Sequence, residues 1–162
     1  MKTTTLRILA ALMAILSLSL CLIACDGGSE ADLYFSANGV KVAVGDAADG
    51  VIAQLGTPVS ETSSASCGGF EGKDYVYTYK GYRVSTTPAK DGQIICKVEL
   101  IDDSVKTPEG LYIGMGREAA ESAMAGKTAE AVGDNLVYTA GSVKLQVIFR
   151  DGSVAGIVYV AK

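Results

Sequence analysis

The cysteines are the residues of this chain best suited to covalent chemistry, and Cys25 has the most informative surroundings. Lys2 and Arg7 give a positive start, and no charge follows Arg7 until the chain has passed Cys25. The apolar run ends in the small residue Ala24, directly before the cysteine. A positive start, an apolar run and a small-residue cleavage site are the layout of a secretory signal. We therefore expect the chain to be exported.

The segment Leu22-Ile23-Ala24-Cys25 resembles the lipobox of bacterial lipoproteins. The resemblance implies a lipoprotein signal peptide over residues 1–24 and diacylation of the Cys25 sulfur, which is sufficient for stable anchoring. The alternative is a transmembrane helix, but the run is near the lower length limit for a span and no basic cluster follows it. We expect a protein held by lipid on the extracytoplasmic face of the cell membrane, with residues 25–32 as a flexible tether.

Cys67 and Cys96 are the two cysteines of the remaining domain, because Cys21 leaves with the signal. Two cysteines in an exported domain most simply form one disulfide. It would close a loop of 28 residues and contribute about 3.5 kcal/mol on the loop-entropy estimate. Strand alternation places Cys96 on the inward side with Val98 and Leu100. A redox-active pair is the alternative, although the Cys-x-x-Cys spacing is missing.

Most other site chemistry is excluded by what the sequence lacks. The chain has no histidine, which removes the commonest general base and metal ligand and every Ser-His or Cys-His nucleophile. Asp102-Asp103 lacks the spaced ligands of a calcium loop, and no Ser-x-x-Lys or glycine-rich phosphate motif is present. We expect no catalytic residue, no metal site and no cofactor, and a protein that is not an enzyme.

The charge balance excludes nucleic acid as a partner. Loss of Lys2 and Arg7 with the signal leaves 12 basic and 18 acidic side chains, a net charge of −6. A nucleic-acid interface needs clustered lysine and arginine, and no such cluster is present. Membrane attachment must therefore come from lipid, not from a polybasic surface.

The first part of the domain, residues 33–106, is predicted to be a helix-plus-sheet unit. A hairpin turns at Asn38-Gly39, and a helix capped by Asp46 has one apolar face and ends at Gly56. The apolar residues of this helix follow a helical spacing. They are Ala48, Val51, Ile52 and Leu55. The strands expected after it are Tyr75–Tyr79, Tyr82–Thr86 and Ile94–Ile101.

The second part, residues 107–162, repeats this plan. A helix is expected near Arg117–Ala125, and the strands that follow are Leu136–Ala140, Val143–Phe149 and Val154–Val160. The Asp91-Gly92 turn and its strand match Asp151-Gly152 and the last strand, which indicates a tandem duplication.

The segment from Val44-Gly45-Asp46 to Leu55-Gly56-Thr57-Pro58, with the strands after it, resembles the SmpA/OmlA outer-membrane assembly lipoproteins. Two such units in tandem resemble the β-lactamase-inhibitor-protein-like fold. The resemblance implies an α+β fold of two tandem units, each a short helical element packed on an antiparallel sheet.

Strand alternation also separates core from surface. The tyrosine-rich side of the first unit, which includes Tyr75, Tyr77, Tyr79 and Tyr82, is expected to be core under the first helix. In the second unit, alternation points four apolar residues outward. They are Val137, Ile148, Ile157 and Tyr159. Single apolar residues are normal on a protein surface, but a cluster of four indicates a binding face. The alternative is that this face packs on the first unit.

These observations favour a non-catalytic protein-binding module at the cell envelope, with a partner among envelope or extracellular proteins. The alternative is a lipoprotein that binds a small ligand or a cell-wall glycan in a cleft between the two units.

Overall fold

The structure is a computed structural model that describes residues 32–162. Within these residues the chain forms ten strands and two short helices. The strands are β1 (Phe35–Ala37), β2 (Val40–Val42), β3 (Ser60–Ala65), β4 (Lys73–Tyr79), β5 (Tyr82–Ala89), β6 (Gly92–Leu100), β7 (Ala129–Val132), β8 (Asn135–Ala140), β9 (Val143–Arg150) and β10 (Ser153–Ala161). The helices are α2 (Ala48–Leu55) and α3 (Arg117–Ala123).

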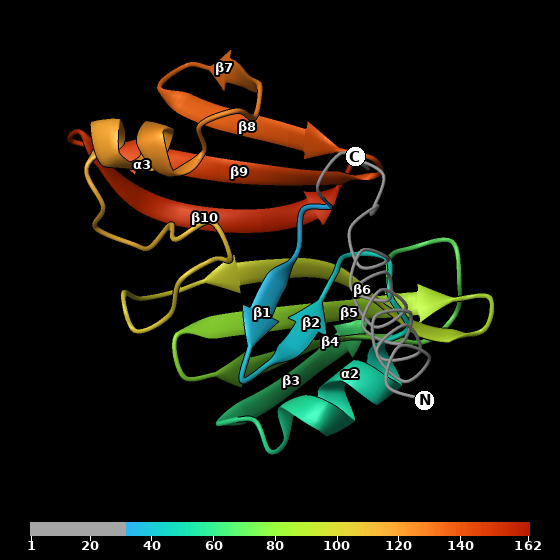
Figure 1. The fold of residues 1–162 in the computed structure, drawn as a ribbon. Helices are drawn as coiled ribbons and strands as arrows, with labels where there is room; N and C mark the ends of the chain where they lie inside the picture. The colour runs from blue at the N-terminus through green and yellow to red at the C-terminus, as the bar shows by residue number, and fades with distance from the viewer. Residues whose placement is uncertain (1–31) are drawn as a thin grey trace, which may run out of the picture.

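Eight of the strands form one antiparallel sheet in the order β3-β4-β5-β6-β10-β9-β8-β7, and β1 and β2 form a separate hairpin (Figure 1). The strand β6 pairs directly with β10, from Ile157 opposite Leu100 to Val160 opposite Lys97. The last strand of the chain therefore joins two runs of hairpins into a single sheet.

The predicted α+β fold of two tandem helix-plus-sheet units is wrong. The protein is mostly β, its helices have only eight and seven residues, and one sheet runs through the ranges 33–106 and 107–162. The pairing of β6 with β10 buries Val98 and Leu100 beside Ile157 and Tyr159. Two separate units would leave these apolar strand edges unpaired, and their pairing satisfies both the backbone and the core.

One face of the sheet, here called the inner face, is covered by the β1–β2 hairpin, both helices and the loop that follows β6. Residues from each of these covering elements belong to the same apolar core as the inward residues of the sheet. They include Phe35 and Val42 of the hairpin, Ala48 and Leu55 of α2, Leu111 of the loop and Ala120 of α3. The opposite, outer face carries none of the described helices.

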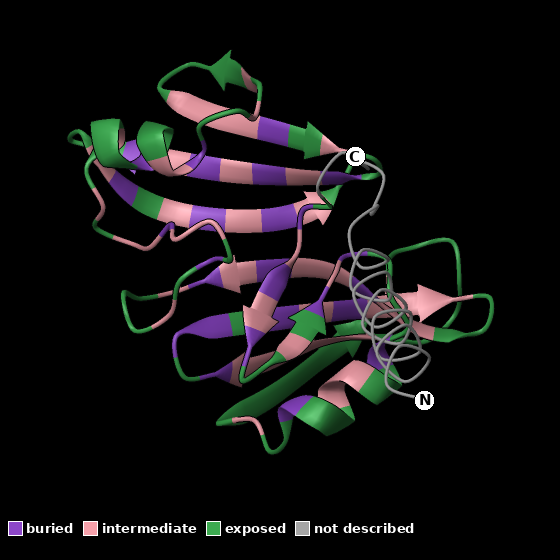
Figure 2. Ribbon diagram, viewed as in Figure 1, coloured by how far each residue is buried: buried purple, intermediate pink, exposed green. Residues whose placement is uncertain are grey.

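The expected core strands are confirmed where alternation is regular. Along β9 the residues Val143, Leu145, Val147 and Phe149 are buried, and those between them are not (Figure 2). Of the tyrosines predicted to be core, Tyr79 and Tyr82 are buried under the hairpin, where the Tyr82 ring lies 4.9 Å from that of Phe35. Tyr75 and Tyr77 are only partly buried.

The predicted helix over residues 48–55 forms, with Ala48 and Leu55 in the core. Its N-cap is Ala47 instead of Asp46, and no side chain caps it. The backbone of Asp46 is engaged elsewhere, since its carbonyl accepts a hydrogen bond from the amide of Ile95 at 2.9 Å.

Two strands carry a bulge at matching places. The pairing shifts at Cys96 on β6 and at Ala155 on β10. Next to each bulge the strand exchanges two hydrogen bonds with the segment that precedes a helix. Ile95 bonds in this way with Gly45 and Asp46, and Val154 with Gly114 and Met115. An extra residue turns the following side chains to the other face.

The two edge strands, β3 and β7, were not expected from the sequence. Ser60–Ala65 is exposed along its whole length, and Ala129–Val132 is short and mostly exposed. Neither segment has the alternating apolar pattern that marks a half-buried strand. Among the described residues no helix is long and apolar enough to cross a membrane.

Candidate functional site

The four residues predicted to form an outward binding face are divided by the sheet. Val137 of β8 and Ile148 of β9 lie on the outer face, whereas Ile157 and Tyr159 of β10 are 0% and 1% exposed in the core. The expectation that Ile157 and Tyr159 point outward is wrong. The bulge at Ala155 is the physical reason, because Val154 and Ile157 both point inward across it.

Tyr159 is a core residue placed against the loop that follows β6. Its pKa is raised by burial and by the nearby carboxylate of Glu109, and its hydroxyl has no hydrogen-bond partner among the described residues. The ring is enclosed in the core and offers nothing to a partner in solution.

The outer face of β7, β8 and β9 is hollowed into a shallow groove of about 310 Å³. Strand pairing places all of its lining residues on the same side of the sheet. They are Glu130, Val132, Asn135, Val137, Lys144, Gln146 and Ile148. Val132 is 52% exposed, which is unusual for a valine in a described strand of this protein. Val132 was missed from the sequence because the strand that carries it was missed.

The groove combines apolar side chains with one charge of each sign. Lys144 and Glu130 line it, and neither takes part in an ion pair within residues 32–162. Toward the centre of the sheet the outer face becomes charged, since Arg83 and Lys97 both lie against Glu99 at 3.8 and 3.5 Å. An apolar centre with a polar margin is the usual anatomy of a protein interface.

The predicted disulfide between Cys67 and Cys96 is absent, and both thiols are free. Cys67 lies in the exposed loop between β3 and β4, whereas Cys96 is the bulge residue of β6, with β4 and β5 between. The Cys96 thiol donates a hydrogen bond to the Ser85 carbonyl at 3.3 Å. Burial raises the pKa of the Cys96 thiol, and the nearby Asp74 carboxylate raises it further.

The remaining site predictions concern lipid and metal. Cys25, the predicted lipidation site, lies outside the described residues, as do residues 1–24. Within residues 32–162, no three potential metal-ligating side chains gather in one place.

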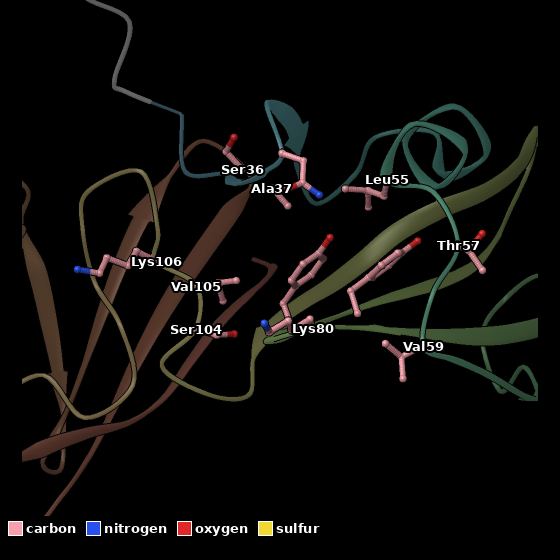
Figure 3. Close-up of a pocket in the computed structure, with 12 residues that line it drawn as sticks. Ser36, Ala37, Leu55, Thr57, Val59, Lys80, Ser104, Val105 and Lys106 are labelled. Carbon is pink, nitrogen blue, oxygen red and sulfur yellow. The ribbon is translucent and has the colours of Figure 1, made fainter.

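A second hollow, here called the recess, lies at the other end of the sheet and on its inner side. It has a volume of about 540 Å³, within the range of small-ligand sites. Four segments form its walls: the end of β1, the end of α2 with the residues after it, the β4–β5 turn and the loop after β6 (Figure 3). No single stretch of sequence marks such a site, because its residues are far apart in the chain.

Comparison with known proteins yields one structural likeness. No protein-family model and no curated protein sequence matches this chain. Its fold is similar to the 1.5 Å crystal structure of an extracellular protein containing a SCP domain from Bacillus anthracis, with a TM-score of 0.51 and 12% sequence identity. The similarity covers 87% of this chain and 50% of that chain, so the chain spans about half the length of that protein. At this identity the likeness concerns the fold alone.

Proposed function

We propose that this protein is a lipid-anchored, non-catalytic binding module on the extracytoplasmic face of the cell membrane. Its partner is an envelope or extracellular protein, bound by the groove on the outer face of β7, β8 and β9. The observation that carries the proposal is the exposed valine Val132 beside Val137 and Ile148 in this groove.

Burial of the apolar side chains of the groove supplies the free energy of binding. Three branched apolar side chains that share one uncovered face are hydrated in the free protein, and a partner that covers them removes apolar surface from water. Lys144 and Glu130, which form no ion pair within residues 32–162, then add specificity, because a partner must match both signs.

Anchoring is supported by the lipobox-like Leu22-Ile23-Ala24-Cys25. The SCP-domain protein from Bacillus anthracis, which has a similar fold, is described as extracellular. A non-catalytic role is supported by the lack of histidine in the sequence.

Photo-cross-linking in the intact envelope tests the proposal. A photo-reactive amino acid at Val132 should give a discrete cross-linked species with one protein. The matched control places the same amino acid at Val59, which is 78% exposed but lies at the recess instead of the groove. An identical cross-linking pattern from both positions, or none from position 132, would contradict the proposed interface.

Substitutions that introduce a charge into the groove provide a second test of the proposed interface. Ile148→Asp and Val137→Asp should abolish the cross-link from position 132 while the protein remains folded, because both side chains already contact water. Thr139→Asp is the control on the same strand and face, and it lies outside the groove lining. Thr139→Asp should keep the cross-link.

A further inference from the structure

The recess has the features of a small-ligand site that is separate from the proposed protein interface. It lies on the inner side of the sheet near the β4–β5 turn, whereas the groove lies on the outer side of β7, β8 and β9. Ligand binding at the recess therefore does not depend on the proposed protein interface.

The base of the recess is a rigid aromatic stack. The rings of Tyr79 and Tyr82 are 5.0 Å apart and nearly parallel, at 13°, and Phe35 packs against Tyr82. Both rings are buried, yet both residues line the recess. Burial raises the pKa of both phenols, that of Tyr82 to about 12. Both hydroxyls are protonated at neutral pH, as those of ordinary tyrosines are, and can donate hydrogen bonds.

The hydroxyl of Tyr79 donates a long hydrogen bond of 3.5 Å to the carbonyl of Gly56. The hydroxyl of Tyr82 has no partner among the described residues. Further hydroxyl and amide groups surround these phenols. They belong to Ser36, Asn38, Thr57 and Ser104. A concave site with several hydroxyl and amide groups around an aromatic base suits a hydroxyl-rich molecule, such as a saccharide.

No acidic residue lines the recess, and Lys80 and Lys106 do. The Lys106 ammonium lies 4.6 Å from the centre of the Tyr112 ring, and its side chain extends away from the recess (Figure 3). Lys80 forms no ion pair within the described residues. The nearby Asp102 carboxylate accepts a hydrogen bond from the Ser104 amide at 2.8 Å. Hydrogen bonding from Ser104 lowers the pKa of Asp102, and the Lys80 charge is close enough to lower it further. Lys80 and Asp102 form no ion pair within the described residues, so the ammonium remains available to a ligand.

The backbone of the β4–β5 turn beside Lys80 is held in place by Gly81. Gly81 has φ +86°, and a Cβ there would overlap Oγ of Ser104 and lie 3.0 Å from a carboxylate oxygen of Asp102. Its carbonyl also accepts a hydrogen bond from the Ile101 amide at 2.9 Å. Only glycine permits this close approach, which holds the β4–β5 turn against the loop after β6 at the wall of the recess.

We propose that the recess binds a saccharide that carries a carboxylate, with the Lys80 ammonium as the partner of the carboxylate and the surrounding hydroxyls as partners of the sugar. An ammonium serves as a point charge for such a group and needs no fixed orientation.

Titration of the full-length, isotope-labelled protein in detergent micelles tests this proposal. The probes are N-acetylmuramic acid and N-acetylglucosamine, the first of which carries a lactyl ether with its carboxylate where the second has the 3-hydroxyl. Chemical-shift changes from N-acetylmuramic acid should centre on the amides of Lys80, Gly81 and Ser104. N-acetylglucosamine should bind at least about tenfold more weakly, as expected for loss of one charge-assisted hydrogen bond.

Lys80→Gln should weaken binding of the acid by a similar factor and leave the neutral sugar unchanged. Lys90→Gln is the matched control, because Lys90 is also exposed in a hairpin turn but lies at the β5–β6 connection. Equal affinity for the two sugars, shifts centred elsewhere, or an equal loss in Lys90→Gln would each overturn the proposal.

Discussion

The side chain of Ile148 lies across the backbone of Gly156 on the neighbouring strand. A Cβ added to Gly156 would be 3.2 Å from Cδ1 of Ile148, closer than an ordinary van der Waals contact. The two residues are paired in the sheet on its outer face. The missing side chain on β10 therefore provides the space in which Ile148 lies, and it shapes the end of the groove.

Gly156→Ala should disturb the groove more than the fold. The new methyl group must displace Ile148 by a few tenths of an ångström, which costs stability, while loss of a glycine restricts the unfolded chain and offsets part of that cost. We expect the free energy of unfolding to change by no more than about 1 kcal/mol, and partner cross-linking from position 132 to fall. Gly50→Ala is the control, since a Cβ at Gly50 meets nothing within 4 Å. It should stabilise helix α2 and leave cross-linking intact.

Ile157→Asp should unfold the protein or cost several kcal/mol, because it places an unpaired charge in the core. Val158→Asp, one residue further on the same strand, should cost much less, since Val158 is partly exposed on the outer face. Urea denaturation of both variants measures the difference. Equal losses would mean that the bulge at Ala155 does not set the register of β10.

Reaction with a thiol reagent should reveal two free cysteines that react at different rates. Cys67 is exposed and should react at once with a thiol reagent in the native protein, whereas Cys96 should react slowly because burial raises the pKa of its thiol and limits access. Cys67→Ser removes the fast phase and identifies it. Absence of both thiols in unfolded, unreduced protein would show that the disulfide forms after all.

Stability should fall at alkaline pH as Tyr82 titrates. Its pKa is raised to about 12 by burial, while an unfolded tyrosine titrates near about 10. The contribution of neutral, buried Tyr82 to the free energy of unfolding is therefore complete below about pH 10, and it is lost as the pH rises toward about 12. Absorbance at alkaline pH should show Tyr82 ionising late, and Tyr82→Phe should remove that step. A Tyr82 that titrates with the exposed tyrosines would contradict the packing under Phe35.

Membrane attachment should depend on Cys25. The lipobox-like ending predicts that Cys25→Ser blocks both lipidation and cleavage at this position, as followed by metabolic lipid labelling and electrophoretic mobility. Cys67→Ser is the matched control and should be lipidated and processed normally. Wild-type processing and membrane retention of Cys25→Ser would refute the anchor.

The sequence by itself determined the local structure. The Asn38-Gly39, Lys80-Gly81 and Asp151-Gly152 turns form where glycine follows a turn residue, because positive φ angles there are a local requirement. The helix over residues 48–55 and the buried side of β9 likewise follow from residue spacing, which depends only on neighbours along the chain. Val137 and Ile148 were placed on the outer face for the same reason.

Tertiary structure decided the rest. The pairing of β6 with β10 joins segments about 60 residues apart, and strand alternation does not specify which edges meet. The bulge residues Cys96 and Ala155 occur where backbone groups of Ile95 and Val154 bond to distant segments before the helices. One extra residue reversed the faces of Ile157 and Tyr159, because side chains alternate with a period of two. The recess arises from contacts between such distant segments, whereas the groove lies on three consecutive strands, the first of which has no sequence pattern that marks it.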